Sequence, residues 1–192
     1  TTNHKPQTTN HKPACRPPPA GGKLQTLNHP MEYDFLVPVE DKVLAHCELL
    51  SPQSLGKNIY VHSGKKGLPV MANVSVAIIG VKESRNAYEK KMQKLDVSAI
   101  RLQLHKLMMG NWVTNIIDMG DIEEGETVED TYFLVKEIVS GLLKENIIPI
   151  VIGATQDITY PVYRAFDGIQ DMINIVSIDS RFDFGTEEFN LV

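Results

Sequence analysis

Continuous apolar runs, rather than alternating ones, dominate the second half of this chain. Such runs are typical of strands that are buried on both faces of a parallel sheet. The predicted strands are residues 74–81, 115–119, 147–152 and 173–178. Helix-length segments separate them, at residues 87–109, 127–145 and 158–166. This alternation predicts an α/β fold, a doubly wound parallel sheet with flanking helices.

The segment 127–145 gives the strongest helical pattern. Its apolar positions share one face and are Val128, Tyr132, Val135, Ile138, Val139 and Leu142. Asn146 follows as a helix stop. The segment 87–109 predicts one or two helices with an apolar stripe that includes Leu95, Ile100, Leu104 and Leu107. The shorter segment 158–166 is expected to be kinked or restarted at Pro161.

The amino-terminal third is organised differently. Residues 1–30 repeat a Thr-Thr-Asn-His-Lys-Pro unit, are rich in proline and have little apolar surface, so we expect a disordered leader or non-native segment. Residues 31–192 form the predicted α/β part. Within it we expect a strand or turn and a short helix over 40–50, then a loop over 52–69.

Charge and composition limit the kinds of molecule that this protein is expected to bind. The net charge of −5 combines +4 in residues 1–30 with −9 in the remainder, and an acidic globular part argues against nucleic acid and anionic membranes. No apolar stretch is long enough for a membrane span. Only Cys15 and Cys47 occur, without metal-binding spacing, which favours a reducing cytoplasm.

Polar residues follow two of the predicted strands directly. Gln156 and Asp157 come after residues 147–152, and Asp179, Arg181 and Asp183 come after residues 173–178. The carboxyl ends of parallel strands are where open α/β sheets carry their functional groups. An extended chain would place Asp179, Arg181 and Asp183 on one face, ~6.5 Å apart. They could bind a divalent cation, share a proton, or form a structural salt-bridge knot around Arg181.

Other polar features have simpler explanations. In the turn 153–157, Thr155 or Asp157 is expected to cap the following helix. The acidic stretch after the second strand is expected to be a solvated loop and helix start; it comprises Asp118, Asp121, Glu123, Glu124, Glu126, Glu129 and Asp130. None of the six histidines is expected near a strand end.

The sequence lacks the motifs of two other classes of protein, nucleotide-binding domains and serine hydrolases. The first strand is not followed by a Gly-x-Gly-x-x-Gly fingerprint, and there is no phosphate-binding Lys-Ser/Thr loop, so a Rossmann-like or flavodoxin-like domain is only a weak alternative. No Gly-x-Ser-x-Gly elbow indicates a serine hydrolase.

Two motifs carry a family resemblance. Residues 151–159 and 176–183 resemble the ureohydrolase superfamily of arginases, agmatinases and formimidoylglutamases. The segments 31–38 and 50–56 are similar to a divergent bacterial branch usually labelled formimidoylglutamase or arginase. The resemblance covers residues 31–192, corresponding to the amino-terminal half of such a protein.

The resemblance implies a metal-dependent hydrolase that cleaves a C–N bond of linear amidines such as formimidoylglutamate or arginine. Two Mn(II) ions would activate a bridging water. Asp179 and Asp183 match metal ligands of the family, whereas Gln156 and Arg181 stand where the family has ligand histidines. A later Ser-x-Asp-x-Asp motif, which supplies two more ligands, does not occur in the 192 residues.

Further expectations follow from this resemblance. The protein would be cytoplasmic and homo-oligomeric and would act on a small molecule. The 192-residue piece by itself is expected to be inactive, and neither a catalytic residue nor a substrate-binding residue is assigned. Arg181 is expected to replace part of the missing metal charge by bridging Asp179 and Asp183. The alternative is a catalytically degenerate relative that serves as a binding or assembly module.

Overall fold

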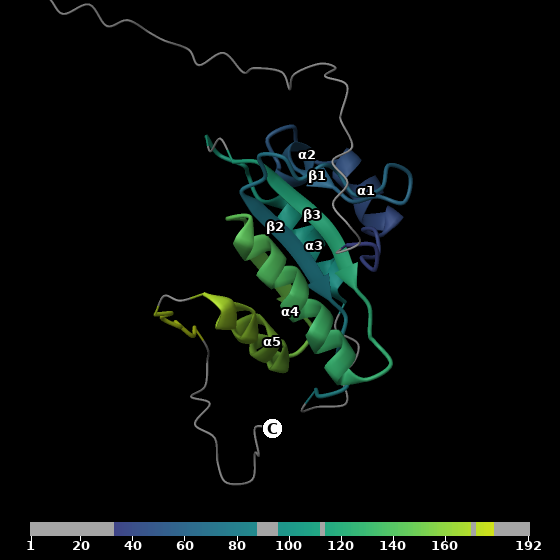
Figure 1. The fold of residues 1–192 in the computed structure, drawn as a ribbon. Helices are drawn as coiled ribbons and strands as arrows, with labels where there is room; N and C mark the ends of the chain where they lie inside the picture. The colour runs from purple at the N-terminus through teal and green to yellow at the C-terminus, as the bar shows by residue number, and fades with distance from the viewer. Residues whose placement is uncertain (1–32, 88–95, 112–113, 170–171, 179–192) are drawn as a thin grey trace, which may run out of the picture.

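A parallel sheet forms the centre of the protein. The computed structural model describes residues 33–87, 96–111, 114–169 and 172–178 (Figure 1). Its sheet consists of β1 (Tyr60–Val61), β2 (Val76–Val81), β3 (Ile116–Ile122) and β4 (Ile148–Gly153). The strands lie in the order β1-β3-β2-β4, and all the pairings are parallel. The predicted α/β class is therefore confirmed.

Helices cover both faces of this sheet. The side chains of β2 alternate, so that Ala77 and Ile79 pack in one apolar cluster with α4 (Val128–Lys144), and Ile78 packs in another with α3 (Val97–Lys106). Figure 1 shows α4 in front of the strands and α3 behind them. The sheet therefore lies between two helical layers.

Shorter helices complete the two layers. On the α3 side lie α1 (Asp41–Glu48) and α2 (Leu55–Asn58). On the α4 side the chain after β4 forms a short 3₁₀ helix η2 (Gln156–Ile158), then α5 (Thr159–Arg164) and a second 3₁₀ helix η3 (Ala165–Gly168). No helix in these described segments is long and apolar enough to cross a membrane.

The strongest helix prediction is confirmed. The side chain of Thr127 accepts a hydrogen bond from the backbone N–H of Asp130, while the carboxylate of Asp130 accepts one from the N–H of Thr127. This capping box satisfies two amide groups that the first turn leaves without helical partners. At the other end Asn146 has a left-handed φ of 58°, a conformation that ends a helix and that asparagine tolerates well.

The predicted apolar stripe of α3 is only partly correct, because, of its members, Leu104 packs against the apolar cluster of Ile78, Val97 and Ile152. Ile100 is 41% exposed and Leu107 is 57% exposed, and Leu95 lies outside the described residues. The buried face carries Val97, Ser98, Arg101 and His105. The helix buries Arg101 and His105 because both contact buried aspartates of β3, as described below.

The fourth strand is also not where the sequence pattern puts it. Residues 172–178 form no strand, and Val176 and Ile178 are 84% and 97% exposed. The fourth strand is β1, inside the segment predicted as a loop, which also contains α2. The apolar run 173–178 indicates a preference for burial, but it does not indicate which part of the protein buries it. The strand β1 has only two residues, which is too short to show a periodic pattern in the sequence.

Smaller differences concern the region after β4. The predicted helix 158–166 is divided among η2, α5 and η3. Pro161 lies in the first turn of α5, where its missing N–H costs no helical hydrogen bond, so the new helix begins two residues before the proline.

Gly80 marks the tightest contact between the sheet and α3. A Cβ atom added there would lie 2.0 Å from Asp121 Oδ1, 2.7 Å from Val97 Cγ1 and 2.9 Å from Arg101 Nη2. Glycine is therefore the residue that lets α3 approach β2 closely.

We expect Gly80→Ala to destabilise the protein by about 3 kcal/mol or more, because the added methyl group would separate Arg101 from Asp121 or displace α3. Urea-induced unfolding followed by circular dichroism measures this change. Gly64→Ala is the matched control, since a Cβ there meets no atom within 4 Å. Equal effects of the two substitutions would contradict the close approach of α3 and β2.

Candidate functional site

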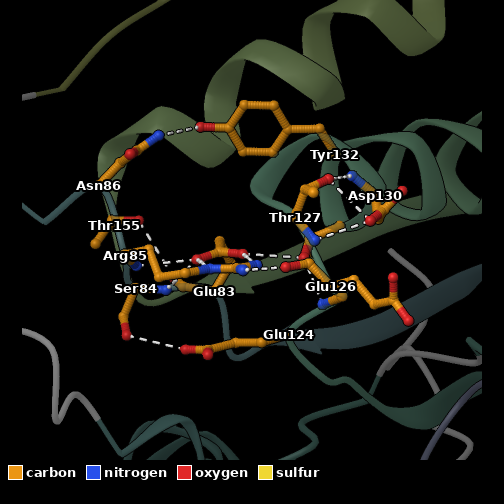
Figure 2. Close-up of polar contacts among 12 residues, drawn as sticks. Glu83, Ser84, Arg85, Asn86, Glu124, Glu126, Thr127, Asp130, Tyr132 and Thr155 are labelled. Carbon is orange, nitrogen blue, oxygen red and sulfur yellow. Dashed lines mark hydrogen bonds and ion pairs between the residues drawn. The ribbon is translucent and has the colours of Figure 1, made fainter.

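The carboxyl ends of β2, β3 and β4 meet at one edge of the sheet. Residues 83–86 follow β2, residues 123–126 follow β3, and residues 154–157 follow β4. The first turn of α4 closes the same edge through Thr131 and Tyr132. Figure 2 shows these segments converging around the side chain of Glu83.

Glu83 is completely buried and is held by hydrogen bonds on both carboxylate oxygens. Its Oε1 accepts from the backbone N–H groups of Ser84 and Arg85 and from Arg85 Nε, at 3.0, 2.9 and 3.0 Å. Its Oε2 accepts from Arg85 Nη2 at 2.5 Å and from the Thr131 hydroxyl at 2.9 Å. Arg85 Nη1 in turn donates to the carbonyl of Glu126. One carboxylate thus ties the end of β2 to α4 and to the loop after β3.

These donors decide the ionisation state of Glu83. Burial alone would raise its pKa, but the hydrogen bonds from Arg85 and Thr131 and the charge of Arg85 outweigh burial and lower the pKa to about 2. Glu83 is therefore an anion throughout the physiological range.

A second chain of hydrogen bonds reaches the turn after β4. Asn86 Nδ2 donates to the Tyr132 hydroxyl at 3.1 Å, and this hydroxyl donates to Asp157. Burial and the hydrogen bond to Asp157 raise the pKa of Tyr132 to about 12, so Tyr132 keeps its proton. The carboxylate of Asp157 is thereby directed to α4.

The expected capping role of Thr155 and Asp157 is wrong. Neither η2 nor α5 has a side-chain cap. The hydroxyl of Thr155 donates instead to the carbonyl of Glu83, at 3.4 Å, and Asp157 accepts from Tyr132. Both residues connect the turn after β4 to the polar cluster, because their partners lie across the sheet edge rather than at the helix start.

The acidic stretch is not wholly a solvated loop. Asp118 and Asp121 lie within β3 and are completely buried. Arg101 of α3, also completely buried, contacts both: its Nε lies 2.8 Å from Asp118 Oδ2 and its Nη2 lies 2.7 Å from Asp121 Oδ1. Burial alone would lower the pKa of Arg101, but these two carboxylates outweigh burial and raise it, so that Arg101 remains a cation.

A bulge explains how both aspartates reach Arg101. Residues three apart normally point to opposite faces of a strand. The register between β2 and β3 shifts from Ile78↔Asp118 to Gly80↔Asp121, and Gly120 takes a left-handed φ of 89° at the shift. The extra residue turns Asp121 to the same face as Asp118.

Histidines also depart from the expectation. His62 follows β1 directly, and its Nδ1 lies 2.9 Å from the carbonyl oxygen of Met119. His105 lies between Asp118 and Cys47, with Nε2 3.0 Å from Asp118 Oδ2 and Nδ1 3.1 Å from Cys47 Sγ. Burial raises the pKa of the Cys47 thiol, which therefore stays protonated. These buried groups belong to the packing of α1 and α3 on the sheet.

The sequence-predicted site is described only in part. Gln156 and Asp157 lie at the edge expected for them, beside the Glu83 cluster. Asp179, Arg181 and Asp183 lie outside the described residues. Sequence reasoning missed Glu83, Arg85 and Tyr132, although Glu83 follows its strand in the same way as Gln156 follows β4.

The fold and this edge define an open parallel α/β protein whose polar residues gather beyond the carboxyl ends of its strands. A comparison with known families matches residues 72–191, more than half of the chain, to the arginase family. The chain belongs to this family, which makes it a ureohydrolase-type protein. No curated protein and no solved structure matches it.

The family is generally manganese-dependent, but the side chains that the structure describes at this edge do not form a site for a pair of metal ions. Among the residues that the structure describes, no three His, Cys, Asp or Glu side chains are grouped so that they could hold a metal. Glu83 is bound by Arg85 and Thr131, and Asp157 by Tyr132. Gln156 offers a neutral amide in place of an imidazole, which is the better ligand for such metals.

We expect stability to depend on pH through Glu83. Because the folded-state pKa is lowered from 4.5 to about 2, its contribution is present above pH 4.5 and is lost as the pH falls toward 2. This contribution is on the order of 3 kcal/mol. Glu83→Gln should lower the unfolding free energy at pH 7 and flatten its decline in acid, as measured by urea unfolding across this range.

Glu137→Gln, on the exposed face of α4, is the control for removing one carboxylate. It should leave the unfolding free energy within about 0.5 kcal/mol of the parent. An acid transition that is identical in the parent and Glu83→Gln would show that Glu83 is not held as described.

Arg101 provides a separate prediction. Arg101→Met would remove the buried guanidinium that contacts both Asp118 and Asp121 and leave Asp121 with only Lys82, which should cost about 3–5 kcal/mol of unfolding free energy. Arg164→Met removes an Arg–Asp pair whose two side chains are nearly half exposed, and should cost about 0–1 kcal/mol. Thermal or chemical unfolding compares the two variants. Similar losses of unfolding free energy would contradict the buried contacts of Arg101 with Asp118 and Asp121.

Proposed function

We propose that this chain contributes to a site that binds linear amidines and hydrolyses their C–N bond, of the formimidoylglutamate or arginine type. Membership of the arginase family supports a hydrolase of this class. The observation that carries the proposal is the convergence of three strand ends on one polar edge, the position where open α/β sheets bind ligands. We also propose a cytoplasmic, homo-oligomeric protein.

Asp179 and Asp183 are the proposed carboxylates that hold positive charge at this site. In the sequence they follow the apolar run 173–178, which forms no strand, and they match metal ligands of the family by resemblance. An amidinium or guanidinium group is a planar cation with several N–H donors, and carboxylates bind it through charge-assisted hydrogen bonds. This role requires no metal ligand from the turn after β4.

A second candidate is a binding or assembly module without catalytic activity. It is favoured by one specific observation: Glu83, the completely buried carboxylate at the edge, is already engaged by Arg85 and Thr131. Such a site retains its shape and its affinity for a cation without activating a water molecule.

Calorimetric titration of the chain with arginine, and with citrulline as the matched uncharged ligand, tests the binding step. Arginine should bind, and citrulline should bind much more weakly because it lacks the guanidinium charge. Asp179→Asn or Asp183→Asn should weaken arginine binding by roughly 10- to 100-fold through loss of a charged hydrogen-bond partner. Agmatine and formimidoylglutamate are titrated in parallel to identify the substrate.

Turnover then separates the two candidates. Release of urea, formamide or ammonia by the complete protein that contains this chain, measured with and without added Mn(II), supports the hydrolase, whereas amidine binding by that protein without product supports the binding module. If arginine and citrulline bind equally, or none of the amidines binds, both candidates are wrong.

A further inference from the structure

We infer that this chain balances the charge of its strand-end site with its own arginine and lysine side chains and does not assemble the paired manganese centre of its family. The inference rests on the proposed function for the location of the site and goes beyond it in naming what neutralises the site's carboxylates. Three independent features of the described edge support it.

The first feature is that cations already occupy this edge. Arg85 contacts Glu83 through two of its nitrogens, and its side chain is only one third exposed. Lys82 Nζ lies 2.6 Å from Glu123 Oε1 and 3.4 Å from Asp121 Oδ2. Two divalent ions would bring four further positive charges close to side chains that are already cationic, and unscreened like charges repel strongly inside a protein.

The second feature is the orientation of the carboxylates. Glu83 directs both oxygens to donors of the protein, and Asp157 accepts from Tyr132, which is itself held by Asn86. Glu124 accepts from the Ser84 hydroxyl, at 3.3 Å. Asp157 Oδ1 is buried and has no hydrogen-bond partner, whereas Glu83 could bind a metal only by giving up hydrogen bonds that connect α4 and the end of β2.

The third feature is the donor at the turn after β4. Gln156 begins η2 at the position where the family has a ligand histidine. An amide oxygen is a neutral and weak ligand, whereas imidazole binds first-row metals well. In the sequence Arg181 stands at the second such position, and a guanidinium cannot ligate a metal because it has no free lone pair. Both differences from the family therefore lower the expected affinity of the site for a metal ion.

Electron paramagnetic resonance of free Mn(II) in the presence of the complete protein that contains this chain, together with the metal content after dialysis, measures the stoichiometry directly. We expect fewer than one bound ion per chain. The double variant Gln156→His with Arg181→His restores both imidazoles and removes a cation, so it should bind Mn(II) at least tenfold more tightly.

Gln103→His with Arg164→His makes the same exchanges at exposed positions of α3 and α5 and should leave Mn(II) binding unchanged. Two ions bound by the unaltered chain would overturn the inference. If the site variant gains no affinity, the assignment to Gln156 and Arg181 is wrong. The amidine titration is evaluated separately from Mn(II) binding. If no amidine binds, the proposed function is wrong, but the conclusion about Mn(II) is unaffected.

Discussion

The charge of Arg101 must be balanced inside the protein, because its guanidinium is completely buried between α3 and the sheet. Taking a cation out of water is costly unless anions and hydrogen-bond acceptors replace the solvent. Asp118, Asp121 and the carbonyl of Gly120 supply them, and the bulge at Gly120 is what brings both aspartates to one face. Gly80 leaves the space that this group fills. We call this group of Arg101, Asp118 and Asp121 the clamp. It determines how α3 packs on the sheet, how β2 and β3 are aligned, and on which face of the sheet β3 carries its charge.

The clamp continues into the candidate site through Lys82. This side chain contacts Asp121 on its buried side and Glu123 at the end of β3, so the core network and the strand-end network share a cation. One residue further on, Glu83 joins the end of β2 to α4 through Thr131. The geometry of the edge is therefore fixed by ionic contacts of the protein itself, and α4 is held in place by its apolar face and by this carboxylate together.

The sequence predicted the features that depend on local periodicity. The strands at Val76–Val81 and Ile148–Gly153 and the helix ended by Asn146 follow from apolar runs and capping residues. It could not predict which charged residues become buried, because Asp118 and Arg101 are buried only in each other's presence and lie on different elements. For the same reason the burial predicted for Ile100 and Leu107 is wrong, because α3 turns Arg101 toward Asp118 and Asp121 beside the apolar contacts of Val97 and Leu104. Gln156 and Asp157 were correctly placed at the sheet edge, since strand-end positions follow from parallel topology.

Fold and chemistry need not change together in such a site. A metal centre contributes to the fold when its ligands have no other partners, and its loss then leaves repelling carboxylates behind. Here Glu83 and Asp157 have protein donors as partners, so the edge keeps its shape without a metal. The sheet can therefore keep its shape in this chain without a metal, because Glu83 ties the end of β2 to α4 through donors of the protein itself.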